Sequence, residues 1–174
     1  KDWDYLEAGL QQRVKALNMF LWDIYHDKKI IKDGIVPEEF VYSSKGYMPQ
    51  CEGISPTGKV YAHIAGIDLV EGKDDNWYVL EDNLRIPSGA SYPMIARKIT
   101  RKGSPSTFAD HAVADNRDYA DLLRDMMDDM NEDRGIAVIL TPGRYNSAFF
   151  EHSYLAEKTG ATLAYPGDLF VEDD

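Results

Sequence analysis

The first apolar pattern of the chain predicts a long amphipathic helix over residues 5–27. Apolar side chains recur there every three or four positions, which places them on one face of a helix. The members of this stripe are Leu6, Leu10, Val14, Leu17, Leu21 and Ile24. A break at Asp33-Gly34, a short helical turn at 37–40 and a loop rich in Ser, Gly and Pro over 43–58 follow.

Two β-rich segments then predict a hairpin. Residues 60–70 are mostly apolar, and residues 77–84 begin Trp-Tyr-Val-Leu. The turn-forming run between them is short enough for a hairpin loop. If residues 73–76 form that loop, Gly72 faces Trp77 across the two strands.

Three oxygen-bearing side chains come together in this hairpin. The same register places Asp68 opposite Glu81, with their Cβ atoms roughly 5 Å apart. Alternation along the strand puts Glu81 and Asn83 on one face and Asp82 on the other. Two facing carboxylates repel unless a proton or a cation lies between them. Two carboxylates with an amide oxygen suit magnesium, which commonly takes phosphates as further ligands, so we expect a nucleotide enzyme. A solvated hairpin face is the alternative.

The middle of the chain predicts two further helices. After a loop at 87–91, residues 92–101 fit a short helix that residues 103–107 break. A clearer helix covers about 117–131 and has an apolar inner face. That face contains Tyr119, Leu122, Leu123, Met126 and Met130.

The pattern changes to that of a parallel sheet from Gly135 onward. The uninterrupted apolar run 136–140 is typical of a strand buried on both faces. A helix over 147–159, closed by Gly160, and a strand over 161–164 complete a βαβ unit. A third short strand is expected at 169–171.

These elements indicate an α/β protein whose first lobe has α+β character. The change of pattern between 131 and 135 separates a helical and β-hairpin lobe, residues 1–132, from a βαβ unit, residues 133–174. No helix follows that unit to cover its sheet, so we expect it to be the truncated start of a larger domain.

Composition narrows the class of protein. The net charge is −11 and no block of Lys or Arg occurs, which disfavours nucleic acid and membranes as partners. The lone cysteine, Cys51, excludes an internal disulfide and a cysteine-type zinc site. The N-terminus does not fit a signal peptide, and no apolar run approaches the ~20 residues of a membrane span. We therefore expect a soluble, cytoplasmic protein.

Arg85 and the loop that follows it are candidate anion-binding groups. Arg85 continues the face of Glu81 and Asn83, and its planar fork suits phosphate or carboxylate. An ion pair with a hairpin carboxylate is equally expected. The next loop offers backbone N–H groups to an anion, although a plain tight turn explains it too. Its candidate residues are Ser88, Gly89 and Ser91.

A second candidate loop follows the apolar run 136–140. Ligands collect at the carboxyl ends of parallel strands, and a helix N-terminus favours anions. The candidate residues are Thr141, Gly143, Tyr145, Asn146 and Ser147. Asn146 or Ser147 also suits the N-cap of the helix. Glu151 and His152 lie one turn into that helix, where His152 fits a packed histidine better than a catalyst.

Four stretches carry the most specific signal. They are GLQQRVKALN with FLWDIY (9–18 and 20–25), GIDL (66–69), YVLEDNLRIPSGASY (78–92) and TPGRYNSAFFEHS (141–153). Together they resemble the circularly permuted ATP-grasp proteins related to glutathionylspermidine synthase. The resemblance implies an ATP-grasp-like metal-binding hairpin, followed by the start of a parallel βαβ unit.

The resemblance also implies a chemistry. Asp68, Glu81 and Asn83 match the family's ligands for one or two Mg²⁺ ions, and ATP is the co-substrate. The reaction makes an acyl phosphate from a small-molecule or peptide carboxylate, and an amine then attacks it. Arg85 would be the catalytic residue that steadies the transferring phosphoryl group.

Two departures from the family pattern matter. Glutathionylspermidine synthase has an arginine just before its metal-binding aspartate, whereas residues 65–67 here are Ala-Gly-Ile, so Arg85 is the candidate replacement. The family's nucleotide-gripping lysines lie beyond the equivalent of residue 174, so we expect the isolated chain to be inactive.

Three alternatives stay open. One is a non-catalytic binding or interaction module with an ATP-grasp-derived fold. Another is a hydrolase with Glu81 or His152 as its base, although four scattered histidines do not support a zinc hydrolase. The third is a structural domain in which Asp68 and Glu81 point apart.

Overall fold

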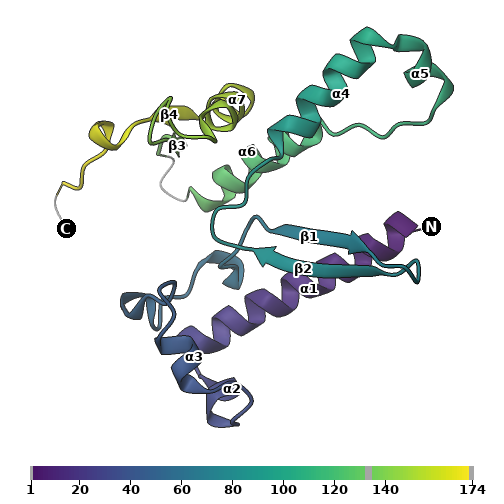
Figure 1. The fold of residues 1–174 in the computed structure, drawn as a ribbon. Helices are drawn as coiled ribbons and strands as arrows, with labels where there is room; N and C mark the ends of the chain where they lie inside the picture. The colour runs from purple at the N-terminus through teal and green to yellow at the C-terminus, as the bar shows by residue number, and fades with distance from the viewer. Residues whose placement is uncertain (1, 132–134, 173–174) are drawn as a thin grey trace. The chain divides into compact units, whose positions relative to one another are not determined.

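The computed structural model describes residues 2–131 and 135–172 (Figure 1). It divides into two compact units, Lys1–Pro87 (unit 1) and Ser88–Asp174 (unit 2). Helices and two small sheets make up the chain, which confirms the expected α/β class. The division falls at 87/88 and not near 131–135, part of which lies outside the described residues. The assignment of domains to 1–132 and 133–174 stays a prediction.

Unit 1 begins with the predicted long helix. Helix α1 spans Asp2–Tyr25, and its apolar stripe is half-buried, with Ile24 fully buried. Two short helices follow, α2 (Lys29–Lys32) and α3 (Glu38–Tyr42). The carboxylate of Asp23 accepts the N–H groups of Lys29 and Ile30 at 3.0 and 2.9 Å, which fixes the turn out of α1.

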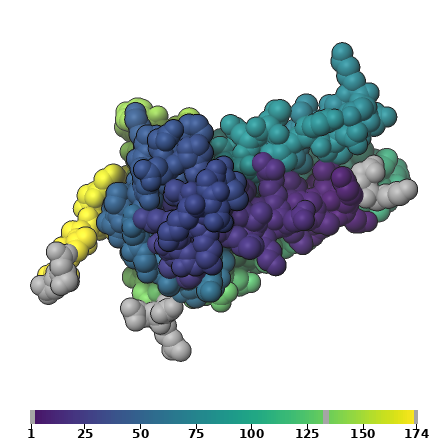
Figure 2. Space-filling view, turned by 90° about the horizontal axis from the view of Figure 1, so that it is seen from below, coloured from purple at the N-terminus to yellow at the C-terminus, as the bar shows by residue number. Residues whose placement is uncertain are grey.

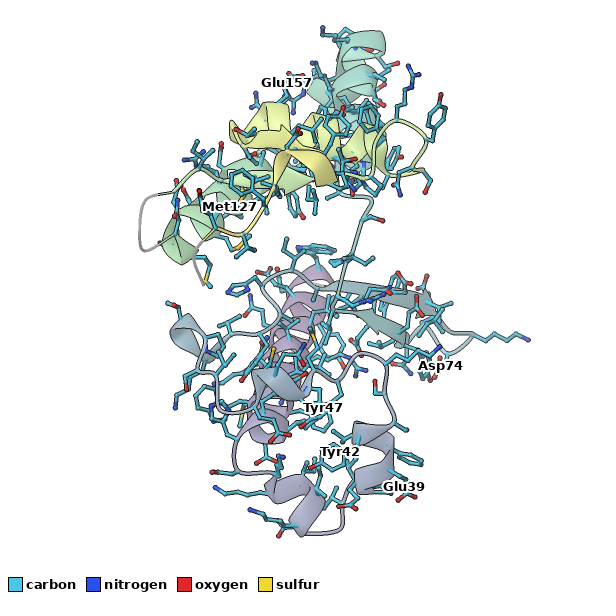
Figure 3. The ribbon with its side chains drawn as sticks, turned by 90° about the vertical axis from the view of Figure 1, so that its left-hand side faces the viewer. Glu39, Tyr42, Tyr47, Asp74, Met127 and Glu157 are labelled. Atoms are coloured by element: carbon cyan, nitrogen blue, oxygen red, sulfur yellow. The ribbon has the colours of Figure 1, made fainter. Side chains whose placement is uncertain are left out.

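Aromatic side chains hold the segment after α1 against the end of that helix. Tyr25 stacks on Tyr47 and on Tyr61, with ring centroids 5.3 and 5.4 Å apart. Tyr42 meets Tyr47 edge-on, and both are labelled in Figure 3. In the space-filling view the blue segment accordingly lies on the C-terminal part of the purple helix (Figure 2). Among the described residues of unit 1, the buried apolar side chains are Ile24, Val41 and Ala62, so the aromatic cluster adds substantially to the packing of this unit.

The residues that lead into the hairpin are not a strand. The predicted strand 60–70 begins only at Gly66, after two 3₁₀ turns at Pro49–Cys51 and Thr57–Lys59. Asn18 of α1 explains the difference. Its side-chain oxygen accepts the N–H groups of Tyr61 and Ala62 at 2.8 and 2.9 Å, and its amide donates to the Ala62 carbonyl. Backbone groups bound in this way are not available to a ladder.

The hairpin consists of β1 (Gly66–Glu71) and β2 (Trp77–Asn83), which pair antiparallel and lie along α1 (Figure 1). Asp74 closes the turn, where Figure 3 labels it. Its carboxylate accepts hydrogen bonds from the Asn76 amide at 2.8 Å and the Tyr78 hydroxyl at 2.7 Å, which lower the pKa of Asp74 to about 2.

Unit 2 is built around one helix, α7 (Phe149–Thr159), which contacts α4 (Ser91–Gly103), α6 (Asp118–Met130), β3 (Val138–Leu140) and β4 (Thr162–Ala164). Strands β3 and β4 pair in parallel on either side of α7 in the chain, which confirms the βαβ unit. Gly160 ends α7 in the left-handed region at φ 72°, as predicted.

Several local predictions for unit 2 are wrong. Helix α4 ends at Gly103, as predicted, but helix α5 (Pro105–Asp110) begins within the predicted break 103–107, because Pro105 suits a first helical position. A 3₁₀ turn at Pro166–Asp168 follows β4, and no strand is present at 169–171. On α6, Leu122 is exposed, while Met127 and Ala120 lie toward the interior.

The first strand of the βαβ unit is not buried on both faces. Ile136 is 81% exposed and Leu140 is 53% exposed. Strand β3 has β4 as its one neighbour within the described residues, and α7 packs against this pair. Large apolar side chains are therefore left without cover. No helix of the described part is long and apolar enough to cross a membrane.

Candidate functional site

The register of the hairpin pairs Asp68 with Glu81, as the sequence predicts. The rest of the register differs from the prediction. Glu71, not Gly72, faces Trp77, and the ladder shifts by one residue between Asp68 and Leu69. A β-bulge at Leu80, which has no partner, makes up the difference.

The bulge also decides which side chains face outward. A regular ladder continued from the turn would pair Asp68 with Leu80. The extra residue moves Glu81 opposite Asp68 and sends Asp82 to the face that meets α1. Asp68, Glu81 and Asn83 thus share the exposed face of unit 1.

The three side chains of this face are within reach of one another. The amide nitrogen of Asn83 donates to Oε1 of Glu81 at 3.1 Å, which leaves the amide oxygen available. A hydrogen bond shared with Glu81 raises the pKa of Asp68, and partial desolvation and the neighbouring charge add to it. Two carboxyl groups held this close share a proton or bind a cation. The donor set fits Mg²⁺, which prefers hard oxygen ligands.

Metal ligation by this triad stays a prediction. Within residues 2–131 and 135–172, no group of three or more His, Cys, Asp or Glu side chains is arranged to hold a metal ion. The triad has two carboxylates, and its third ligand is an amide, so additional ligands would have to come from phosphate or water.

Arg13 of α1 locks the hairpin in place. Its Nε and Nη2 donate to the two carboxylate oxygens of Asp82 at 2.7 and 2.6 Å. These bonds lower the pKa of Asp82, whose side chain is only 15% exposed. Arg13 is thus exposed and yet held by a partner. This pair holds Asp82 against α1. Because consecutive side chains of a strand point to opposite faces, Glu81 then points outward.

Arg85 is exposed just beyond the end of β2. Among the described residues it forms no ion pair with Asp68 or Glu81, so that alternative is not realised. Its guanidinium group is free to meet an anion. A catalytic role for Arg85 stays a prediction.

In unit 2, the predicted anion loop already holds a carboxylate of the protein itself. Gly89 donates its N–H to Oε1 of Glu151 at 2.6 Å. Ser91 donates both its N–H and its hydroxyl to Oε2, at 2.8 and 2.6 Å. Glu151 is 4% exposed and Ser91 is fully buried. An external phosphate would compete with Glu151 for these donors, whereas Ser88 is exposed.

The electrostatics of Glu151 favour its ionised form. Burial alone raises the pKa of this carboxyl. The bonds from Ser91 and Gly89, with a smaller contribution from His152, outweigh burial, and the pKa lies below its ordinary value. A charged carboxylate thus fastens the loop to α7.

The neighbouring residue of α7 holds the second predicted loop. Nδ1 of His152 lies 2.8 Å from the hydroxyl oxygen of Thr141, which also accepts the N–H of Gly143 at 3.2 Å. Thr141 and Gly143 are buried, and the Thr141 N–H donates to the Ala164 carbonyl. These two loop residues serve the packing of unit 2, and His152 is the packed histidine that the sequence predicts.

The remaining residues of this loop reach the surface. Tyr145 is 90% exposed, and its hydroxyl accepts a hydrogen bond from Arg144 at 3.2 Å. Asn146 accepts the N–H of Ala148 at 2.9 Å in the turn before α7. The N-cap of α7 is Ala148, so the predicted N-cap at Asn146 or Ser147 is wrong. Ser147 is exposed. Ligand binding by Tyr145, Asn146 and Ser147 stays a prediction.

The sequence alone did not identify Glu151 as the residue that joins these loops. Glu151 and His152 are consecutive in α7, yet each bonds to a different loop, 88–91 and 141–143. An acidic residue in the first turn of a helix was the available signal, and it is common. The partner loop lies some sixty residues away, so only the packed structure shows the contact.

Comparisons with known proteins support the resemblance. The family model described as "A circularly permuted ATPgrasp" matches residues 1–174. "Uncharacterized protein sll0335" of Synechocystis is 43% identical over 175 residues, which are 99% of this chain and 36% of that protein. "Uncharacterized protein Rv2411c" of Mycobacterium tuberculosis is 46% identical over 176 residues, 99% of this chain and 32% of that protein.

A third relative has a functional name. "Putative glutamate--cysteine ligase 2-2" of Frankia casuarinae is 39% identical over 178 residues, 99% of this chain but 20% of that protein. The chain spans about a third of the length of the first curated relatives that it matches. The activity of the longer proteins therefore does not pass to this chain by similarity alone.

Proposed function

Because the chain belongs to the circularly permuted ATP-grasp family, we propose that it supplies the magnesium-binding face of an ATP-dependent ligase. The ligase would join a carboxylate to an amine in an amide bond. The name of the Frankia relative is consistent with ligation of this kind. A closer relation to glutathionylspermidine synthase is part of the proposal and rests on the resemblance of the hairpin residues.

The observation that carries the proposal is the close pair Asp68–Glu81. Their positions face each other across β1 and β2, and the hydrogen bond that Asp68 shares with Glu81 raises the pKa of Asp68, with further contributions from desolvation and from the neighbouring negative charge. Asn83 bonds to Glu81 and adds an uncharged oxygen at the same edge. A structural domain without a ligand gains nothing from exposing such a pair.

The proposed reaction has two steps. A carboxylate oxygen of the substrate attacks the γ-phosphorus of ATP, which forms an acyl phosphate and releases ADP. The amine then attacks the acyl carbon, the C–O bond to phosphate breaks, and the amine loses a proton. One or two bound Mg²⁺ ions would neutralise phosphate charge. Arg85 would hold the transferring phosphoryl group through its free guanidinium.

We assign substrate contacts to the exposed parts of unit 2. Ser88, Tyr145, Asn146 and Ser147 present hydroxyl and amide groups at the surface of the two loops that α7 supports. Such groups suit a small-molecule or peptide carboxylate. Gly89, Ser91, Thr141 and Gly143 would act through the shape of the loops, since their polar groups are engaged inside the protein.

The remainder of the ATP clamp would come from the part of the longer relatives that this chain does not span. ATP held from one side only is poorly positioned for transfer. We therefore propose that the isolated chain has little or no ligase activity. A cytoplasmic location is the natural one for an enzyme that consumes ATP, and it stays a prediction.

Binding of Mn²⁺, followed by electron paramagnetic resonance, tests the metal face directly. Asp68→Asn should weaken binding at least about tenfold, because a charged ligand becomes neutral. Glu71→Gln is the matched control, since it removes an exposed carboxylate from the same strand outside the triad. Equal loss in both variants, or no binding by the native chain, would contradict the proposal.

Release of ADP separates the ligase from its alternatives. This chain and a longer version should be compared with ATP, a carboxylate and an amine. Turnover by the longer version alone supports the proposal. Turnover without ATP would favour a hydrolase. A longer version that binds neither magnesium nor nucleotide would favour a non-catalytic interaction module.

A further inference from the structure

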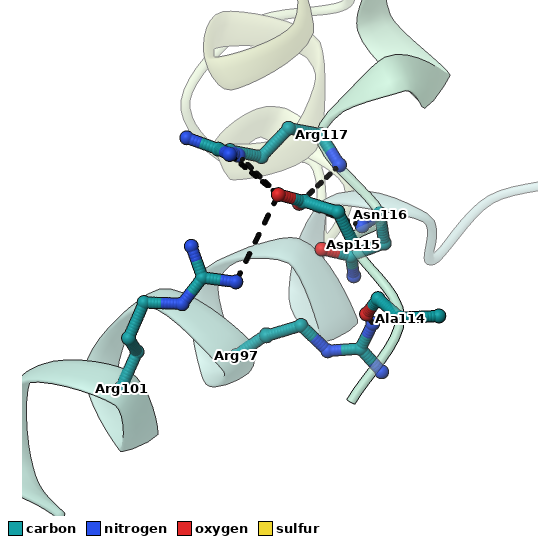
Figure 4. A network of polar contacts seen from close by, with 6 residues as sticks. All are labelled: Arg97, Arg101, Ala114, Asp115, Asn116 and Arg117. Carbon is teal, nitrogen blue, oxygen red and sulfur yellow. Dashed lines mark hydrogen bonds and ion pairs between the residues drawn. The ribbon is translucent and has the colours of Figure 1, made fainter. Parts of the chain in front are cut away.

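A pocket of about 440 Å³ in unit 2 is lined mainly by basic side chains. It lies against α4, α6 and α7, and part of it is drawn in Figure 4. Two acidic residues, Asp115 and Asp121, also line it. The basic residues of the pocket are Arg97, Lys98, Arg101, Lys102, Arg117 and Lys158. This concentration is unusual because the whole chain has a net charge of −11.

Three arginines converge on the segment before α6 (Figure 4). Nε of Arg117 donates to Oδ2 of Asp115 at 2.8 Å, and Nη2 of Arg101 lies 3.8 Å from the same oxygen. Arg97 donates to the carbonyl of Ala114. One carboxylate and one carbonyl thus face three guanidinium groups. Asp115 neutralises only part of this charge.

Lys98 and Lys102 add positive charge to this pocket. They lie one turn apart on α4 and both are exposed, and within the described residues neither forms a hydrogen bond or an ion pair. Lys98 lies close enough to Glu157 to help lower the pKa of that carboxyl, whereas no such neighbour is seen for Lys102 in the described part. Like charges at this spacing repel each other on a helix. Arg97 and Arg101 repeat the spacing one residue earlier. The like charges on the face of α4 toward the pocket therefore destabilise the helix itself.

The pocket also has an apolar wall. Met94 and Ala120 are buried beside it, and the ring of Tyr154 is half-buried. Nζ of Lys158 lies 5.5 Å from the centre of that ring. Small-molecule sites have volumes of roughly 300–1,000 Å³ and combine such walls with a few charged groups.

We propose that this pocket, which is formed by residues of unit 2 alone, binds a small phosphorylated anion. Phosphate oxygens match both the guanidinium fork and the lysine ammonium. A single carboxylate would leave most of the surplus charge unpaired. A nucleic acid would extend beyond the pocket onto an acidic protein, which disfavours it.

Titration calorimetry with inorganic pyrophosphate in EDTA at low ionic strength tests this site without involving magnesium. The double variant Lys98→Gln/Lys102→Gln should weaken binding about tenfold or more. Its fold should be intact, since neither lysine forms a hydrogen bond or an ion pair with the described residues, and circular dichroism checks this. The matched control is Lys15→Gln/Lys32→Gln, which removes the same charge from exposed sites in unit 1 and should change the affinity less than about twofold.

Three outcomes decide the proposal. No binding of pyrophosphate by the native chain overturns it, and so does equal weakening in both double variants, which would show unspecific attraction. Selective weakening in the pocket variant supports it. Asp68→Asn should bind pyrophosphate normally, so that a failure of the metal site and a failure of this pocket remain distinguishable.

The kind of ligand follows from a second titration with ADP under the same conditions. Binding of ADP tighter than that of pyrophosphate, reduced by Tyr154→Leu, indicates a nucleotide that uses the apolar wall. Equal or weaker binding of ADP indicates inorganic phosphates. Either result counts only if Lys98→Gln/Lys102→Gln weakens binding more than the control double variant does.

Discussion

Glu151 accepts two hydrogen bonds from Ser91, one from its backbone N–H at 2.8 Å and one from its hydroxyl at 2.6 Å. A third bond, from Gly89, completes a buried carboxylate anchor between α7 and the loop at the start of unit 2. The donors that could have held a phosphate thus hold a side chain of the protein. The loop has a defined shape before any substrate binds.

Replacing Glu151 by Gln should destabilise unit 2 by about 2 kcal/mol at neutral pH, because the charge-assisted bonds are lost and an amide NH₂ meets N–H donors. Denaturant unfolding measures this loss. The control is Glu157→Gln on the same helix, where an exposed carboxylate pairs with Lys158 and little change is expected. A similar loss in both variants would argue against the anchor.

The stability that Glu151 contributes should depend on pH. Its folded pKa lies below the ordinary value, so the unfolded chain binds the proton more readily. The contribution is complete above the unfolded pKa and is lost as the pH falls through the folded pKa. Unfolding curves of the native chain and Glu151→Gln should therefore converge in acid. A constant gap at all pH values would show that the carboxylate is not the cause.

Gly89→Ala should cost about 1–3 kcal/mol through the backbone alone. The residue has φ of +110°, and no atom lies within 4 Å of the position that a Cβ would take. Strain rather than collision would thus disturb the bond to Glu151. Gly103→Ala is the matched control, since it also meets no atom and has an ordinary φ. Thermal unfolding compares the two, and equal stabilities would refute the explanation.

Arg13→Gln should loosen the hairpin from α1 and lower the stability of unit 1 only modestly, because Arg13 is 44% exposed. Lys15→Gln, on the same helix and with no ion pair to any described residue, should have a smaller effect than Arg13→Gln. Hydrogen exchange of the β2 amides provides the local readout. Faster exchange in Arg13→Gln than in Lys15→Gln is the expected result, and no difference would exclude the locking role.

Metal binding at the hairpin should strengthen as the pH rises. The raised pKa of Asp68 means that the metal-free protein retains a proton there above the ordinary value for aspartate. A cation must displace this proton, so affinity grows as the pH passes through that pKa, and a proton is released on binding. Titrations with Mn²⁺ at several pH values check this. The residual binding of Asp68→Asn should lose this part of the pH dependence.

Most features of the hairpin could be predicted from the sequence. Turn residues and strand-forming runs predicted two strands, and alternation predicted that Glu81 and Asn83 share a face. The pairing of Asp68 with Glu81 was right, although the loop was assumed one residue too short. The longer loop shifts the register by one residue, and the bulge at Leu80 shifts it back, so the two changes cancel. A bulge cannot be recognised from the alternation of residues along a single strand.

Other features had no local signal. Asn18 delays the start of the predicted strand by bonding to Tyr61 and Ala62, and Glu151 reaches Ser91 across sixty positions. One part of the basic pocket is visible in the sequence, as the pairs Arg97–Lys98 and Arg101–Lys102 at helical spacing. Such pairs usually mark a solvated face, and only their convergence with Arg117 and Lys158 makes a pocket.

The sequence by itself determined the main helices, the hairpin, the βαβ unit and the three oxygen-bearing side chains of the hairpin face, because these depend on spacing between near neighbours in the chain. Only the tertiary structure decided the bulge that places Glu81 opposite Asp68, the partners of Arg13 and Glu151, and the gathering of basic groups on α4. Those relationships join residues far apart in the sequence, and they arise from packing and from the need to pair buried polar groups.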